Sequence, residues 1–149
     1  MASVHVSTES RQDHATPQIF LHAVEQAFGA VPILDLAASR DNRKCETWID
    51  AEENSLSVDW VERLAVVRRG LFRSTGDAWL NPPFRGVDPW MEKCKIESAR
   101  GMRIVSLTLA SLGTAWYRNH VEGKALSLVL RKRIAFVGQK DLTHLSPYF

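Results

Sequence analysis

The chain has 149 residues, of which 45% are hydrophobic and 24% charged, and its formal net charge is +2. This composition is typical of a soluble globular protein, and the length favours one domain with a sheet covered on two faces over two substantial domains. No apolar run is long enough to span a bilayer and the first residues lack the apolar centre of a signal peptide, so we expect an intracellular, cytoplasmic protein without a membrane partner.

The cysteines and histidines do not indicate a metal site. Cys45 and Cys94 lie far apart and have no Cys-x-x-Cys partner, which is typical of reduced thiols without a function. The five histidines are scattered without the spacing of metal ligands. We therefore expect no metal.

The N-terminal part predicts a tail followed by a helix. Residues 1–15 are polar and without periodicity, so we expect a flexible tail, and residues 16–149 are expected to form the single domain. Thr16 and Pro17 make a helix start, with a hydroxyl at the N-cap and proline at the first helical position. Apolar residues at helical spacing follow, and Gly29 ends the helix.

Residues 31–36 form an apolar strand pattern that contains one charge, Asp35. An acidic residue at the carboxyl end of a parallel strand, followed by small residues such as Ala37 and Ala38, can make room for a ligand at the rim of a doubly wound sheet. Alternatively, Asp35 caps the next turn through its side chain. The sequence leaves both interpretations open.

Further along, Thr47-Trp48-Ile49 is a short strand pattern. Asp59 precedes an apolar pattern that predicts a short amphipathic helix within residues 61–77, and its carboxylate can cap this helix. Arg68 and Arg69 in the same segment could contact a nucleic-acid backbone or keep a loop soluble.

The stretch Trp79-Leu80-Asn81-Pro82-Pro83-Phe84 ends a strand in an unusual way. Asn81 offers a carbonyl acceptor, the carbonyl of Pro82 stands outside any strand ladder, and Phe84 supplies a flat apolar face on a backbone stiffened by Pro82 and Pro83. Together they could hold a planar group that carries an exocyclic amine. Alternatively, Asn-Pro starts a turn and the prolines and the aromatic ring pack a loop.

The remaining residues alternate between helix and strand patterns. Asp88 and Pro89 open a helix, as N-cap and first helical residue, that runs to about Arg100 with Ile96 among its buried residues. Residues 102–109 predict a central strand, residues 111–121 a short helix, and residues 125–130 another strand. This alternation predicts an α/β fold with a mainly parallel, doubly wound, Rossmann-like sheet.

Several short motifs, in a fixed order, resemble one family. Asn81 to Phe84 resembles the Asn/Asp-Pro-Pro-Tyr/Phe motif of amino-group methyltransferases. With the further segments that match, the chain resembles the phage-type (Dam-like) DNA N6-adenine methyltransferases; these segments are Asp35-Leu36-Ala37-Ala38-Ser39, Asp59-Trp60, Thr114-Ala115-Trp116-Tyr117 and Arg133-Ile134-Ala135-Phe136. Three departures stand out: Leu36 replaces a proline, Asn54-Ser55-Leu56 replaces Asp-Gly-Leu, and the strand that follows a segment like Ser146-Pro147-Tyr148-Phe149 is absent.

The resemblance implies an S-adenosylmethionine-dependent enzyme that methylates the N6 amine of adenine in DNA, in a bacterial or phage-infected cell. It implies catalytic roles for Asn81, Pro82, Pro83 and Phe84. The predicted cofactor residues are Thr16, Pro17, Asp35, Leu36, Ala37, Ala38 and Asp59, with Asp59 accepting a hydrogen bond from the adenine amine of the cofactor. The predicted DNA contacts are Arg85, Arg68, Arg69, Arg131 and Arg133.

Two alternatives remain at this point. A shortened methyltransferase fold could bind nucleic acid or a protein without turnover, which the departures from the family pattern favour. A methyltransferase that acts on a protein glutamine is a weaker alternative, because a carboxamide also presents an amine on a planar group. The sequence does not decide the oligomeric state, and a homodimer is one option.

Overall fold

The computed structural model describes residues 16–71, 76–132 and 134. The predicted tail 1–15, Arg133, and the elements expected beyond residue 134 lie outside the described residues. The elements are α1 (Gln18–Phe28), β1 (Pro32–Asp35), β2 (Thr47–Trp48), a 3-10 helix η2 (Ser55–Ser57), α2 (Trp60–Gly70), β3 (Asp77–Leu80), α3 (Asp88–Ala99), β4 (Ile104–Ser106) and α4 (Ala115–His120).

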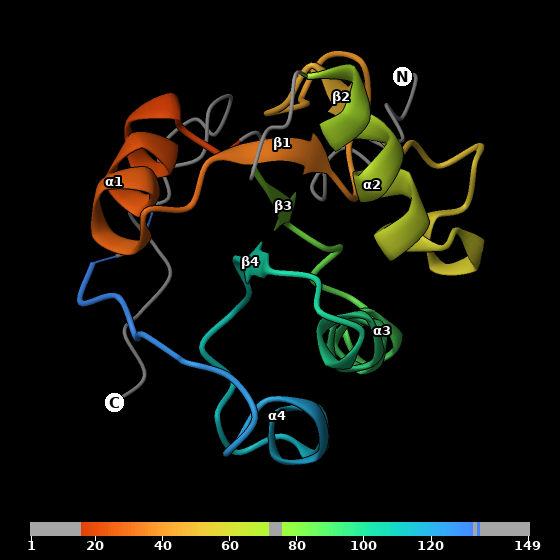
Figure 1. Ribbon diagram of the computed structural model, residues 1–149. Coiled ribbons are helices and arrows are strands. Elements are labelled where there is room, and N and C mark those ends of the chain that lie inside the picture. Colours follow the sequence, from red (N-terminus) through yellow and green to blue (C-terminus); the bar gives the residue numbers. More distant parts are fainter. Residues whose placement is uncertain (1–15, 72–75, 133, 135–149) are drawn as a thin grey trace, which may run out of the picture.

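Four short strands form a parallel sheet in the order β2-β1-β3-β4 (Figure 1). From β1 the chain first adds β2 on one side and then crosses over to add β3 on the other. The strand order therefore reverses between β1 and β3, and open parallel sheets bind ligands at the carboxyl ends of the strands beside such a point.

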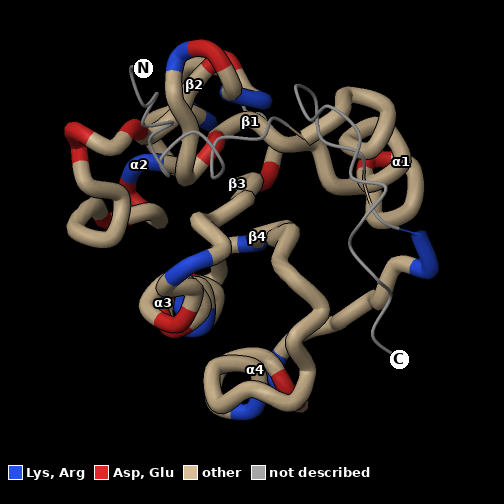
Figure 2. The backbone as a smooth tube through the Cα atoms, turned by 180° about the vertical axis from the view of Figure 1, so that it is seen from behind, with Lys and Arg blue, Asp and Glu red and all other residues tan. Residues whose placement is uncertain are grey.

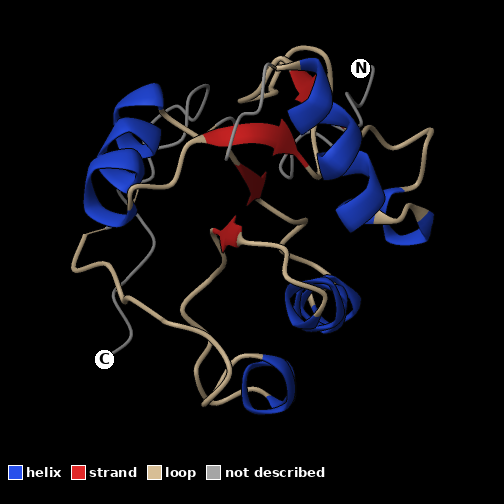
Figure 3. Ribbon diagram, viewed as in Figure 1, coloured by secondary structure: helices blue, strands red, loops and turns tan. Residues whose placement is uncertain are grey.

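Helices cover both faces of the sheet, and alternate side chains of β3 pack against helices on opposite faces. Ala78 and Leu80 belong to a core cluster with residues of α2 and α3, whereas Trp79 packs against α1 with Leu21 and Val24. Figures 1 and 3 show α1 on one side of the sheet and α2 and α3 on the other. Successive strand residues point to opposite faces, so the expected doubly wound α/β architecture is confirmed.

The start of α1 differs from the prediction. Its N-cap residue is Pro17 and no side chain caps the helix, so Thr16 is not the expected hydroxyl cap. Thr16 is instead buried. At the other end Gly29 takes a left-handed conformation, with φ 58°, and its N–H donates to the carbonyl of Glu25 at 2.8 Å. Glycine adopts this conformation without the steric cost of a Cβ, as expected for a helix end.

The segment 61–77 contains the expected helix, α2, and this helix is part of the core. Trp60 and Leu64 are buried against the sheet. Arg68 Nε donates to the carbonyl of Gly76 at 3.0 Å and so links the last turn of α2 to the residue before β3. The chain passes very close to β1 here, because a Cβ added to Gly76 would lie 2.4 Å from Cγ2 of Ile33.

Two strand predictions need correction. Residues 102–109 form only the three-residue strand β4, which lies at an edge of the described sheet and not at its centre. Residues 125–130 form no strand, and Leu126 is 78% exposed. Leucine and valine favour strands only where a neighbouring strand and a packed face are available, and this segment has neither among the described residues.

Helices α3 and α4 pack against each other beyond β4 (Figure 1). Helix α3 begins at Asp88 after the N-cap residue Val87, so Asp88 lies in its first turn and is not the N-cap. Near its end Glu97 is buried whereas Ile96 is 51% exposed, the reverse of what its hydrophobicity suggests. The buried carboxylate is paired with Lys93 at 2.9 Å and Arg100 at 2.8 Å. These two ion pairs offset the free energy that burial of a charge costs.

Candidate active site

The segments predicted to bind ligands meet at one edge of the sheet, where the strands end. Asp35 at the end of β1 is in register with Trp79, and Trp79 with Val105. The N–H of Leu36 donates to the carbonyl of Trp79 at 2.9 Å, and the N–H of Leu107 donates to that of Leu80 at 2.9 Å. These bonds hold the two residues before Asn81 to the residue after β1 on one side and to the residue after β4 on the other. The residues after β1, β3 and β4 therefore form one continuous rim.

Asn81 carries an unused hydrogen-bond acceptor at this rim. Its side-chain oxygen Oδ1 is buried and has no hydrogen-bond partner in the described part of the chain. A buried polar atom without a partner costs roughly 1–3 kcal/mol. Such an atom beside the point where the strand order reverses is available to a donor from a ligand.

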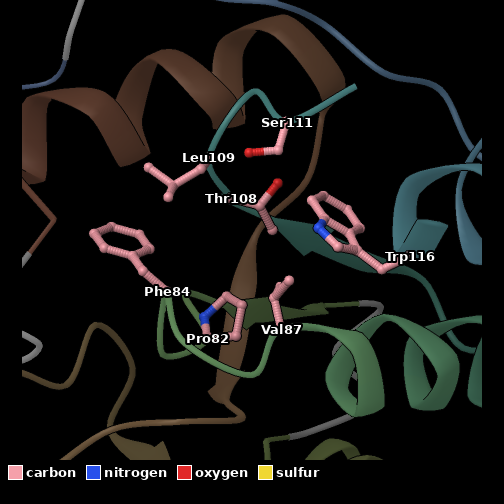
Figure 4. Close-up of a pocket in the computed structure, with 7 residues that line it drawn as sticks. All are labelled: Pro82, Phe84, Val87, Thr108, Leu109, Ser111 and Trp116. Atoms are coloured by element: carbon pink, nitrogen blue, oxygen red, sulfur yellow. The ribbon is translucent and has the colours of Figure 1, made fainter. Parts of the chain in front are cut away.

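Beside the Asn-Pro-Pro-Phe segment, a small solvent-open pocket of about 40 Å³ lies between two loops (Figure 4). Residues that come after β3 in the chain form one wall of the pocket, and residues that come after β4 form the other. The lining residues are Pro82, Phe84, Val87, Thr108, Leu109, Ser111 and Trp116. The structure thus brings Pro82 and Phe84 of the predicted catalytic motif to a pocket, whereas Asn81, next to Pro82 in the chain, is not among the lining residues.

The carboxylate of Asp35 forms hydrogen bonds with the backbone of the loop that follows it. Its carboxylate is 2% exposed and accepts hydrogen bonds from the N–H groups of Ala37 at 3.3 Å and Lys44 at 2.9 Å. Burial raises the pKa of Asp35 despite these bonds. The interpretation that Asp35 caps the next turn is confirmed. Of the other predicted cofactor residues here, Leu36 turns its side chain into the core and Ala38 is buried.

Asp59 caps α2 and is also paired with an arginine. Its Oδ1 accepts from the N–H of Glu62 at 2.9 Å, so the predicted helix cap is confirmed. Both carboxylate oxygens accept from Arg100, at 3.0 and 2.8 Å. The hydrogen bond from Arg100 is the main reason why the pKa of Asp59 is lowered. An amine donor would compete with Arg100 for these oxygens.

Two further polar groups are those of Thr16, which belongs to the predicted cofactor residues, and of Asp50, which does not. Oγ1 of Thr16 is buried without a hydrogen-bond partner in the described residues, as Asn81 Oδ1 is. Asp50, two residues after β2, was missed in the sequence analysis. Its Oδ1 accepts from the N–H groups of Glu52 and Glu53 at 3.1 and 3.0 Å. The signal that could have found it is an acidic residue at the end of the second strand, where doubly wound folds bind sugar hydroxyls.

The predicted DNA contacts are not gathered at the site. Arg85 is exposed directly after Phe84, and Arg131 and Arg69 are exposed elsewhere. Arg68 donates a hydrogen bond to the carbonyl of Gly76 at the amino end of β3, whereas Asn81 follows the carboxyl end of this strand. Figure 2 shows basic residues spread over several elements and mixed with acidic ones. Of the predicted arginines, Arg85 has the position closest in the chain to the motif.

The remaining sequence expectations concern thiols, metals and membranes. Cys45 and Cys94 are free, and burial raises the pKa of each to about 12, which makes them poor nucleophiles near neutral pH. In the described ranges, no three His, Cys, Asp or Glu side chains gather to hold a metal ion. Among the described helices, none has the length and apolarity that crossing a bilayer requires.

A parallel doubly wound sheet with an Asn-Pro-Pro-Phe segment at its rim, beside a pocket with an aromatic wall, is the arrangement of a methyltransferase that acts on an amino group. The particular family follows from comparison with known proteins. The model of the family "DNA N-6-adenine-methyltransferase (Dam)" matches residues 3–145, and the chain belongs to this family. The resemblance found in the motifs is confirmed, and the family's reaction is methylation of the N6 amine of adenine in DNA.

Three relatives agree with this assignment. The chain is 35% identical over 86 residues to the Escherichia coli (strain K12) protein named "Putative methyltransferase YfdM", covering 58% of this chain and 81% of the relative. It is 27% identical over 128 residues to a DNA N-6-adenine-methyltransferase of Haemophilus phage HP1, covering 85% of this chain and 66% of the relative. It is 29% identical over 103 residues to that of Escherichia phage T1, covering 69% of this chain and 38% of the relative. No solved structure matches the chain.

Proposed function

We propose that this chain transfers the methyl group of S-adenosylmethionine to the N6 amine of adenine in DNA, and that Asn81 and Pro82 act on that amine. The observation that carries the proposal is the buried, unpartnered Oδ1 of Asn81 at the carboxyl end of β3. It lies in the segment that matches the family motif, and it is an acceptor without a donor in the described protein.

The chemistry explains why an acceptor is needed there. The lone pair of an adenine amine is delocalised into the ring, so the amine is a weak nucleophile. Hydrogen bonds from its two protons to Asn81 Oδ1 and to the carbonyl of Pro82 draw the nitrogen toward tetrahedral geometry and stabilise the positive charge that develops on it. Asn81 Oδ1 is buried and Asn81 does not line the pocket, so its side chain would have to rotate for this hydrogen bond to form.

In this proposal the methyl donor lies along the residues that follow β1 and β2. S-adenosylmethionine, when bound, supplies an electrophilic methyl group for in-line transfer. Ala37 and Ala38 after β1 have small side chains, Thr16 offers a hydroxyl without a partner in the described residues, and Asp50 offers a carboxylate for sugar hydroxyls. These residues fit a ligand that carries a ribose and charged polar groups. Asp35 contributes by shaping the loop that contains Ala37.

The base must leave the duplex before it can reach this site. Extrusion costs about a few kcal/mol, which contacts with aromatic and apolar side chains offset in part. Phe84 lines the pocket and provides such a surface. Arg85, exposed and adjacent to Phe84, is the predicted arginine best positioned to meet a phosphate near the extruded base.

The test is transfer of labelled methyl groups from S-adenosylmethionine to unmethylated DNA, followed by nucleoside analysis. We expect label in N6-methyladenine with the wild type and none with Asn81→Ala, while calorimetry gives similar cofactor affinity for both proteins. Label in another base, or equal label with both proteins, would refute the proposal. Absence of cofactor binding by the wild type would favour a binding module without catalytic activity.

A further inference from the structure

We propose that Thr108, Ser111 and Trp116, in the loop and helix after β4, determine which base the active site accepts. This inference rests on the proposed function, because it assigns the pocket beside Asn81 to the target base. The two hydroxyls would donate hydrogen bonds to ring nitrogens of adenine, and the indole would close the far end of the pocket.

This wall faces the catalytic motif across the rim of the sheet. Residues of β3 and β4 pair in register up to Leu80 and Ser106, so the loops that follow them face each other across the rim. The loop after β3 supplies Pro82, Phe84 and Val87, and the segment after β4 supplies the remaining lining residues. A base held by its amine at Asn81 and Pro82 would present the rest of its ring to the segment after β4.

The wall carries two hydroxyl groups and an indole ring. Figure 4 shows the side chains of Thr108 and Ser111 across the pocket from Pro82 and Val87, with Phe84 at one end and Trp116 at the other. Within the described residues neither hydroxyl takes part in a hydrogen bond that would keep it from a ligand. Each hydroxyl can donate one bond and accept others. A flat, mostly apolar pocket with two hydroxyls along one side suits a heteroaromatic ring with acceptor nitrogens, such as adenine.

Backbone hydrogen bonds hold the part of the wall around Ser111 in place before any base arrives. The carbonyl of Ser111 accepts from Thr114 twice, from its hydroxyl at 2.6 Å and from its N–H at 3.1 Å. The N–H of Ser111 donates to the carbonyl of Leu109 at 2.8 Å. These bonds fix the turn that carries Ser111. A preorganised hydroxyl discriminates between ligands better than a mobile one, because less of its freedom is lost on binding.

Trp116 is anchored in a similar way. One side of its ring packs against the main core cluster, and its neighbour Tyr117 meets it edge-on, with centroids 5.9 Å apart. Helix α4 is also tied to α3 by Nε2 of His120, which lies 3.3 Å from Oδ1 of Asp88. The indole is therefore a fixed boundary. Removing it would lengthen the pocket and weaken the preference for a ring of one size.

The experiment compares binding of short single-stranded homopolymers of dA, dC and dT, measured by fluorescence anisotropy, because single strands need no extrusion and no known recognition sequence. The variants are Thr108→Val with Ser111→Ala, which removes both hydroxyls at nearly constant shape, and Trp116→Ala. Trp116→Phe keeps an aromatic boundary if Trp116→Ala does not fold. Ser98→Ala, on the exposed side of α3, is the matched hydroxyl control.

We expect the wild type and Ser98→Ala to bind dA more tightly than dC or dT. In the double variant, the ratio of these affinities should fall about tenfold, as expected for the loss of two hydrogen bonds of ordinary strength. Trp116→Ala should lower it as well, and Trp116→Phe should restore part of it. A wild type without preference for dA, or folded variants with unchanged preference, would overturn the inference.

Methyl transfer, measured on the same proteins, separates this inference from the proposed function. Transfer by the wild type together with unchanged base preference in the variants would overturn the inference alone. A preference for dA that the variants reduce, in a protein without methyl transfer, would support the base pocket and refute the proposed reaction.

Discussion

Replacement of Asn81 by alanine should reduce activity without reducing stability. Oδ1 of Asn81 is buried and has no partner among the described residues, and such an atom costs roughly 1–3 kcal/mol of folding free energy. Alanine removes this cost and loses little packing, because Asn81 is only half-buried. We therefore expect the free energy of unfolding to stay constant or rise by about 1–2 kcal/mol, which raises the melting temperature by about 2–8 °C in a domain of this size.

The same change should lower methyl transfer strongly. Loss of one group that stabilises charge in a transition state typically costs about 10²–10³ in turnover. The assays are thermal unfolding by circular dichroism without cofactor, and steady-state methyl transfer to DNA. Asn42→Ala is the contrasting variant, because Oδ1 of Asn42 accepts from the N–H of Ser39 at 2.7 Å, and its loss should destabilise the protein by about 0.5–1.5 kcal/mol.

Two outcomes would refute this reasoning. If Asn81→Ala lowers the melting temperature as much as Asn42→Ala does, the Asn81 oxygen has a partner in the folded protein and its role is structural. If Asn81→Ala keeps full turnover, the residue takes no part in the reaction.

Three further predictions follow from the charged groups and from one close backbone approach. Burial raises the pKa of Asp35 above 3.8, so the stability that Asp35 contributes is fully present below pH 3.8 and is lost as the pH rises through its folded pKa. Asp35→Asn should remove this loss of stability, which urea titrations at several pH values would measure. An identical pH dependence in both proteins would contradict the prediction. Arg100 lowers the pKa of Asp59, so the stability that this pair contributes is present above pH 3.8 and is lost as the pH falls through the folded pKa of Asp59. Arg100→Gln should raise the pKa of Asp59 again, which an NMR titration of its carboxyl carbon would measure. An unchanged pKa would disprove the pairing. Gly76→Ala should cost about 1–3 kcal/mol, because the new Cβ would lie 2.4 Å from Ile33, and Ile33→Ala should recover part of that cost in a double-mutant cycle; strictly additive effects would argue against the contact.

The fold could be predicted from the sequence because local patterns and the parallel sheet agree. The strand at residues 77–80 is short and apolar, and its alternation places Trp79 on one face and Ala78 and Leu80 on the other. Asn81 was identifiable because an amide followed by two prolines cannot continue a strand. Glycine at residue 29 likewise marked the end of α1.

Other features depend on contacts between distant parts of the chain, which periodicity does not report. Glu97 is buried because Lys93 and Arg100 pair with it, whereas its charge alone predicts exposure. Residues 125–130 have a strand composition but no neighbouring strand in the described chain. The pocket wall formed by Thr108 and Ser111 was missed because neither hydroxyl belongs to a motif, and only the register of β3 and β4 brings the two loops together.

This arrangement of the two loops has a consequence for how the protein can evolve. The hydrogen bonds of the sheet end at Leu107, and the residues that line the pocket from Thr108 onward contribute nothing to the ladder. Mutations at Thr108, Leu109 and Ser111 can therefore accumulate without loss of a hydrogen bond between the strands, whereas Trp116 also packs against the core. If the proposed function holds, changes in substrate preference can arise in this segment while the loop after β1 stays unchanged.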